Sequence, residues 1–198
     1  MTGVHSQEKQ LAGTDNGMAT VIGIGFMTFF GAIWWLMAAG FAGGAQPLMI
    51  VAGVVVVGAL VWRTVQFARA VGGRPAAPSP VFAARQRTFS RIGLTEGVAI
   101  AAGAIVFGIT GRPEWIPAWC ALVVGVHFLP LSRLFGVPIY WTTGLVLIAV
   151  ATVTVLVVSL ADLPRAAWFV VPGVLSAVTL WGTSVVLLRI SVSPQPPP

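Results

Sequence analysis

The sequence predicts an all-α protein, a polytopic membrane helix bundle in which six transmembrane helices form three hairpins. Six apolar stretches meet or approach the length of about 20 residues that a helix needs to cross a bilayer. Short connections rich in Pro and Gly separate these stretches. Of the 198 residues, 57% are hydrophobic and only 8% are charged, whereas soluble domains carry about 25% charged residues. The surface therefore faces lipid, which excludes a secreted disulfide scaffold, a disordered chain and an ordinary soluble enzyme.

The first predicted hairpin consists of Met18–Phe41 and Pro47–Phe67, joined by the turn FAGGAQP. Its first stretch is about twice as long as the apolar core of a signal peptide, and the segment ahead of it lacks a compact basic start. We therefore expect this stretch to remain as a membrane anchor and residues 1–17 to form a cytoplasmic tail. At the other end of the chain, residues 191–198 are expected to form a disordered tail.

The second and third predicted hairpins follow the same plan. Ile92–Ile109 and Trp115–Leu134 are joined by the turn TGRPEW. Val137–Leu160 and Ala167–Ile190 are joined by ADLPR, and a tight RLFGVP connection links the two hairpins. Residues 18–190 thus form one six-helix transmembrane domain.

The connection between the first two hairpins, about residues 69–91, is long and basic. Its first half is rich in Pro, Gly and Ala and is expected to be extended. Its second half, Val81–Arg91, predicts an interfacial helix with Phe82 and Phe89 facing lipid. The arginines either bind anionic lipid headgroups, at about 1 kcal/mol each, or only set the topology. The arginines concerned are Arg85, Arg87 and Arg91.

The distribution of basic residues indicates the orientation of the chain. With a cytoplasmic amino terminus, nine Lys and Arg residues fall on the inner side and two on the outer side, where each has an acidic neighbour. This bias follows the positive-inside rule, so both termini are expected to be cytoplasmic. It also explains the net charge of +6 without a nucleic-acid partner. The inner residues are Lys9, Arg63, Arg69, Arg74, Arg85, Arg87, Arg91, Arg133 and Arg189, and the outer residues are Arg112 and Arg165.

Aromatic side chains are concentrated near the predicted helix ends, where amphipathic rings prefer the level of the lipid headgroups. We therefore interpret these residues as an aromatic belt. Trp34 and Trp35 lie deeper in the first span and are expected to line a lipid face or a cavity. The expected belt residues are Trp62, Trp115, Tyr140, Trp141 and Trp168.

Three ionisable side chains lie at membrane depth, where a charge is costly unless it has a partner or water. Arg63 lies near the inner end of the second span, Glu96 about one turn into the third, and His127 about two turns before the inner end of the fourth. All three are expected in the cytoplasmic third of the bilayer. Because a short turn joins the third and fourth spans, we expect Glu96 to contact His127. Arg63 either belongs to this site or extends its long side chain to the inner interface.

The sequence around the pair favours close packing and a local break. A stripe of small residues on the third span lets another helix approach Glu96. In the fourth span, Pro130 follows His127 and cannot donate to the carbonyl of Val126, which predicts a broken helix with a free acceptor. Such a constellation could carry protons or bind a cation, and the same groups also suit a buried structural pair. The small residues are Gly93, Gly97 and Ala101.

Other chemistries lack the residues that they need. A zinc site takes three or four Cys, His or carboxylate ligands, and the chain has two His and one Cys, with His5 in the tail. The phosphate-cradling, metalloprotease and nucleophile-elbow motifs are absent from the sequence. We therefore expect no metal, no cofactor and no enzymatic activity, and we interpret Cys120 as a packing residue.

The second hairpin also carries a more specific pattern. The run EGVAI at Glu96–Ile100 is followed by VGVHFLPLSRLF at Val124–Phe135 and by PIYW at Pro138–Trp141. This pattern, EGxAI…VGxHFLPLxxLF, resembles a group of uncharacterised small bacterial multi-pass membrane proteins and covers about a quarter of the chain. The resemblance implies a protein of the bacterial inner (plasma) membrane and implies no activity.

Two function classes lead, and an intramembrane enzyme is a distant third. The first is a small transporter-like or permeation protein, in which Glu96 accepts or coordinates a proton or small ion and His127 changes its charge near neutral pH. Arg63 is a third candidate for this site. The alternative is a non-transporting membrane scaffold or accessory subunit, whose small-residue faces pack against partner helices and whose polar pair only fixes packing. A homo-oligomer is compatible with either class.

Overall fold

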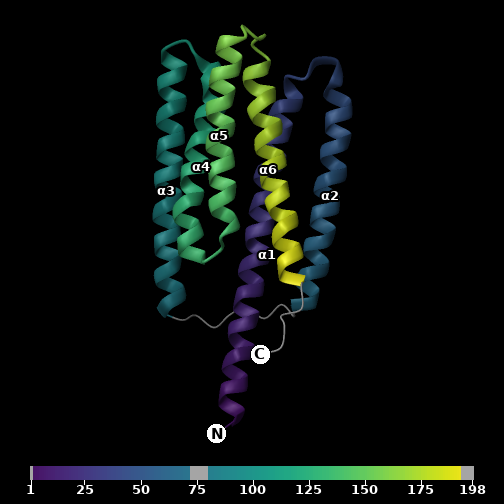
Figure 1. The fold of residues 1–198 in the computed structure, drawn as a ribbon, viewed down its shortest axis with the longest axis vertical. Coiled ribbons are helices and arrows are strands. Elements are labelled where there is room, and N and C mark those ends of the chain that lie inside the picture. Colours follow the sequence, from purple (N-terminus) through teal and green to yellow (C-terminus); the bar gives the residue numbers. More distant parts are fainter. Residues whose placement is uncertain (1, 72–79, 193–198) are drawn as a thin grey trace.

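The computed structural model describes residues 2–71 and 80–192 (Figure 1). Within these residues the chain forms helices and no strand. Six helices are long and apolar enough to cross a membrane, which confirms the predicted fold class. They are α1 (Thr2–Gly40), α2 (Gln46–Val71), α3 (Pro80–Ile109), α4 (Ile116–Phe135), α5 (Ile139–Leu160) and α6 (Ala167–Val192), with 3-10 turns η1 (Gly43–Ala45) and η2 (Pro113–Trp115).

Glycine and proline residues end the helices where the sequence predicts breaks. α4 ends at Phe135 because Gly136 adopts a left-handed conformation (φ 66°), and the N–H of Gly136 donates to the carbonyl of Ser132. Gly111 is left-handed after α3, with a φ of 71°. Pro113 then opens η2, which leads into α4. These breaks keep the connections short and make successive helices antiparallel.

The helices run alternately up and down, so α6 ends at the end of the bundle from which α1 enters it (Figure 1). We call this the terminal end, and we call the opposite end, with the connections after α1, α3 and α5, the loop end. α1 packs against α2 and α6, and α4 packs against α3 and α5. Contacts between α5 and α6 join these two three-helix groups. α2 and α3 lie at opposite edges of the bundle (Figure 1).

The amino-terminal part of α3 differs from the prediction. The separate interfacial helix predicted at Val81–Arg91 is wrong, because no Gly or Pro interrupts this segment and it forms the first turns of α3. Phe89, predicted to face lipid, packs edge-on against Phe135 of α4 with ring centroids 5.8 Å apart. The side chain of Phe82 and residues 72–79, which the sequence predicts to be extended, lie outside the described residues.

The two predicted tails are partly helical. Residues 2–17 belong to α1, which continues beyond the terminal end of the bundle (Figure 1). α6 extends to Val192. The rest of the predicted carboxy-terminal tail, 193–198, lies outside the described residues.

Three indole rings join neighbouring helices in the same way. Each lies over a glycine of the next helix and donates its N–H to a backbone carbonyl three or four residues before that glycine. We call these the indole–glycine contacts. They are Trp35 of α1 with Gly53 and the carbonyl of Met49 in α2 (2.6 Å), Trp119 of α4 with Gly103 and the carbonyl of Ala99 in α3 (2.9 Å), and Trp181 of α6 with Gly31 and the carbonyl of Thr28 in α1 (3.2 Å).

The hydrocarbon interior of a membrane explains this geometry. An indole N–H without an acceptor is costly there, because no water can replace the missing partner. A helix carbonyl keeps a second lone pair after its own helical hydrogen bond, but a side chain on the following turn would obstruct it. Glycine has no such side chain, so the indole can approach the backbone and reach the carbonyl. The contact therefore satisfies the tryptophan and brings two helices close together.

α4 and α5 approach each other at a pair of glycines. A Cβ atom at Gly125 would lie 2.8 Å from the carbonyl oxygen of Gly144, and a Cβ atom at Gly144 would lie 2.6 Å from that of Gly125. Beside this contact, Phe128 packs edge-on against Tyr140 with ring centroids 5.8 Å apart. The backbone of α4 is thereby fixed against α5 immediately next to His127.

Some of the aromatic residues expected in the belt are buried instead. Tyr140 and Trp168 are only 8% and 9% exposed, and Trp168 stacks on Trp115 with ring centroids 5.3 Å apart. Trp34, expected at a lipid face or a cavity, belongs to the buried core. Trp62 is 64% exposed and faces outward, as a belt residue would.

Replacing Gly31 with Ala is expected to lower the stability of the bundle by about 1–3 kcal/mol, the usual cost of overpacking. The added methyl group would collide with the indole of Trp181. This ring cannot easily move aside, because it is buried and packs on Trp35. The measurement is unfolding of the purified protein in detergent micelles.

Gly25, on the same helix, provides the matched control, because a Cβ atom there would have no neighbour within 4 Å. Gly25→Ala is expected to leave the stability unchanged or to raise it, since Ala favours a helix over Gly by about 1 kcal/mol. Equal effects of the two substitutions would contradict the indole–glycine interpretation.

Candidate functional site

Side chains pair across the antiparallel helices α3 and α4 along most of their length. Along the two helices, contacts that include an aromatic residue lie before and after the contact between Glu96 and His127. These contacts hold the carboxylate and the imidazole at the same level of the bundle. From the loop end to the terminal end, the pairs are Phe107 with Trp115, Gly103 with Trp119, Glu96 with His127, and Phe89 with Phe135.

The structure brings Glu96 and His127 together. Glu96 Oε2 lies 3.1 Å from His127 Nδ1, and 22% of the Glu96 side chain and 11% of the His127 side chain are exposed. The distance is that of an ion pair, but Nδ1 has no well-aligned hydrogen bond within the described part of the chain. The backbone of Ile92, one turn before Glu96, also lies next to the ring. α3 therefore contacts the imidazole through both a side chain and its backbone.

Glu96 lies farther from the start of its helix than the sequence suggests. The apolar part of α3 covers Gln86–Ile109, so Glu96 is about 15 Å from one end and about 20 Å from the other at 1.5 Å per residue. The carboxylate therefore lies near the middle of α3, and its place in the cytoplasmic third of the bilayer stays a prediction. The reason is that the helix begins at Pro80, whereas the predicted apolar stretch begins at Ile92.

Arg63 does not join this pair. It is exposed on α2, which packs against α1 and α6 and lies across the bundle from α3 (Figure 1). The long connection between α2 and α3 allows this separation, because it does not force the two helices to be neighbours. The position of Arg63 fits the alternative interpretation, a side chain that extends to the interface.

The stripe of small residues beside Glu96 receives no other helix among those that the structure describes. Cβ atoms built at Gly93 and Gly97 would have no neighbour within 4 Å, and Ala101 is exposed. The helix that approaches Glu96 is α4, and it does so at Gly103, on a different face of α3. The stripe thus remains an open surface next to the carboxylate.

α4 is not broken at Pro130. The helix is continuous over Ile116–Phe135, and Pro130 occupies an exposed position within it. The prediction of a broken helix is therefore wrong: the loss of one backbone N–H does not end a helix whose neighbouring turns are packed against α5.

Buried hydroxyl groups form a second set of polar atoms, on α1, α5 and α6. The hydroxyls of Thr143 and Thr183 hydrogen bond to each other at 2.7 Å. Thr28, Thr154 and Ser176 are also buried, and their hydroxyls have no partner within the described residues. These helices are not α3 and α4, so the hydroxyls are separate from the Glu96–His127 pair.

The pair can exchange a proton or hold a small cation. Within residues 2–71 and 80–192, no group of three or more His, Cys, Asp or Glu side chains could hold a metal ion. A carboxylate and an imidazole at ion-pair distance can share one proton, gain a second or lose the first.

Comparison with known proteins gives one match. No curated protein and no solved structure matches the chain significantly. A family model matches residues 82–191, more than half of the chain, and this region contains both Glu96 and His127. The chain belongs to a family of unknown function (DUF7010).

Proposed function

We propose that this membrane protein is a small transporter-like or permeation protein, in which Glu96 and His127 bind and release a proton or a small cation. The observation that carries the proposal is the 3.1 Å separation of Glu96 Oε2 and His127 Nδ1 near the middle of a membrane-spanning helix. Ionisable groups at such depth are costly and commonly mark ion or proton pathways.

The pair offers three states that differ by one unit of charge. Without a proton it carries one negative charge and can attract a small cation. With one proton it is neutral, and with two it is positive. Because an imidazole changes its charge near neutral pH, such a pair can respond to a physiological proton gradient.

The surroundings of the pair support access to it. The Glu96 side chain is 22% exposed, and the open positions at Gly93 and Gly97 leave room for water or an ion beside it. On its other side, the contact of Trp119 with Gly103 holds α4 against α3. An ion would therefore approach from the open face of α3 rather than through the contact with α4.

A scaffold or accessory subunit is the second candidate, and the exposed face of α3 favours it. Of the hydrophobic residues on this helix, Leu94 is 70% exposed and Ile105 is 63% exposed. A partner helix or a second copy of the chain could pack along Gly93 and Gly97, since small residues permit close helix contacts in membranes. The polar pair would then only stabilise α3 against α4.

We further propose that the terminal end faces the cytoplasm in the inner membrane of a bacterium. The basic residues of the helix ends support this orientation, because among the described residues the loop end has two, Arg112 and Arg165, and the others lie toward the terminal end. In this orientation the arginines at the start of α3 would contact anionic lipid headgroups. These arginines are Arg85, Arg87 and Arg91.

Glu96→Gln and His127→Ala are each expected to abolish a pH-dependent flux of protons or small cations, because each removes one of the two groups that share the proton. The measurement is flux into proteoliposomes that contain the purified full chain, between about pH 5 and pH 8.

Glu114→Gln is the matched control for this experiment. Glu114 lies at the loop end, 3.5 Å from Arg165, so its substitution should leave the flux unchanged. Unchanged flux in the Glu96 and His127 variants would refute the transport proposal. If the unmodified chain shows no flux and both variants lose thermal stability, the scaffold is the better explanation.

The proposed orientation predicts which cysteines react from outside the cell. After Cys120→Ala removes the native thiol, Arg165→Cys should react with a membrane-impermeant maleimide added to the periplasmic side, because Arg165 is exposed at the loop end. Arg87→Cys, at the terminal end, should react only after the cells are permeabilised. The reverse pattern would overturn the orientation.

A further inference from the structure

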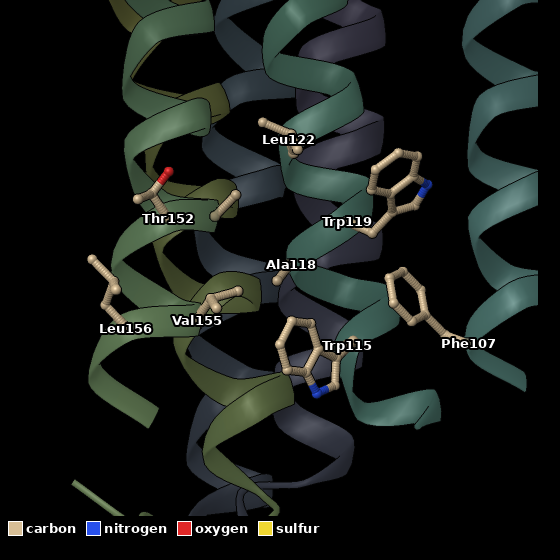
Figure 2. Close-up of a pocket in the computed structure, with 9 residues that line it drawn as sticks. Phe107, Trp115, Ala118, Trp119, Leu122, Thr152, Val155 and Leu156 are labelled. Carbon is tan, nitrogen blue, oxygen red and sulfur yellow. The ribbon is translucent and has the colours of Figure 1, made fainter. Parts of the chain in front are cut away.

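A groove of about 340 Å³ lies between α4 and α5 near the loop end, with Phe107 of α3 at its side. Figure 2 shows the rings of Phe107, Trp115 and Trp119 on one side and Thr152, Val155 and Leu156 of α5 on the other. Leu156 is 53% exposed, so the groove opens onto the surface that faces lipid. Its volume falls within the range of about 300–1,000 Å³ that is usual for small-molecule sites.

The lining of the groove suits an apolar chain rather than a polar solute. Most of the lining residues are aromatic or aliphatic. The hydroxyl of Thr152 already donates to the carbonyl of Ile148 at 3.0 Å. The lining side chains therefore offer hydrocarbon contacts and little to recognise a polar group.

The end of the groove nearest the loop end is polar and charged. Trp115 forms part of the groove wall, and the guanidinium of Arg112 lies 5.9 Å from its ring centroid. Trp115 also stacks on Trp168, and Trp168 lines a second hollow together with Glu114 and Arg165. Because Glu114 lies 3.5 Å from Arg165, Arg112 is the cation at this rim that is available to an anionic group.

From this arrangement we propose that the groove binds one acyl chain of a phospholipid in the leaflet at the loop end, with the phosphate of that lipid next to Arg112. An apolar groove that ends at an arginine positioned over an indole complements a molecule with a hydrocarbon chain and an anionic head. The interface level preferred by indole rings coincides with the position of a phosphate above its acyl chains. The charge at the rim therefore selects a phospholipid over an uncharged lipid.

The test uses the full chain in nanodiscs that contain a phospholipid with a photoreactive diazirine in one acyl chain. After irradiation and digestion, mass spectrometry maps the labelled residues. Labelling should be concentrated on the residues that line the groove. Thr152→Phe, which fills the groove, should reduce this labelling about tenfold, as expected for the loss of a specific site.

Thr142→Phe is the control for this substitution, because Thr142 is also exposed on α5 but does not line the groove. It should leave the labelling unchanged. The label map of the unmodified chain tests the site without any substitution. Labelling that is spread evenly over the exposed faces of α2 and α3, or that is insensitive to Thr152→Phe, would overturn the proposal.

A second probe tests the phosphate contact. Diacylglycerol with the same photoreactive chain should label the groove about fivefold less than the phospholipid, since one arginine near the membrane surface contributes a modest attraction. Arg112→Gln should reduce phospholipid labelling to the diacylglycerol level, whereas Arg69→Gln at the terminal end should not. Equal labelling by the two probes would refute the role of Arg112.

Discussion

Hydrocarbon offers no hydrogen-bond partner, and this constraint governs how the helices of this chain meet. An indole N–H must find an acceptor inside the protein, and the nearest acceptors are carbonyls of the adjacent helix. Those carbonyls can be reached where a glycine leaves the backbone uncovered. The hydroxyls of Thr143 and Thr183 meet the same requirement by bonding to each other. The carboxylate of Glu96 instead lies at ion-pair distance from His127, and this pair can change its charge.

The polar contacts also explain the arrangement of the bundle. α1 provides both Gly31 for an indole of α6 and Trp35 for a glycine of α2, and so it is the centre of one three-helix group. α4 is the centre of the other group, because its Trp119 contacts a glycine of α3 and its Gly125 contacts a glycine of α5. The candidate site belongs to the second group, where two close contacts fix α4 and, among the described residues, α3 packs along one edge against α4.

Much of the fold follows from the sequence, because the length of the apolar stretches and the positions of Gly and Pro determine the number and order of the helices. The short turn between α3 and α4 also predicts that Glu96 meets His127. Other features depend on tertiary contacts. For example, Trp119 is an interhelical hydrogen-bond donor rather than a belt residue because Gly103, on another helix, leaves a backbone carbonyl within reach of its indole. The helix α3 begins at Pro80 rather than at the predicted Ile92, because charged residues extend it past its apolar part.

The contact of Trp119 with Gly103 makes the size of each residue depend on the size of the other. A larger residue at 103 would displace the indole, and a smaller residue at 119 would leave a void beside the glycine. Among family members, drift at either position is therefore expected to be compensated at the other. Such correlated replacement would mark the contact between α3 and α4 as inherited architecture.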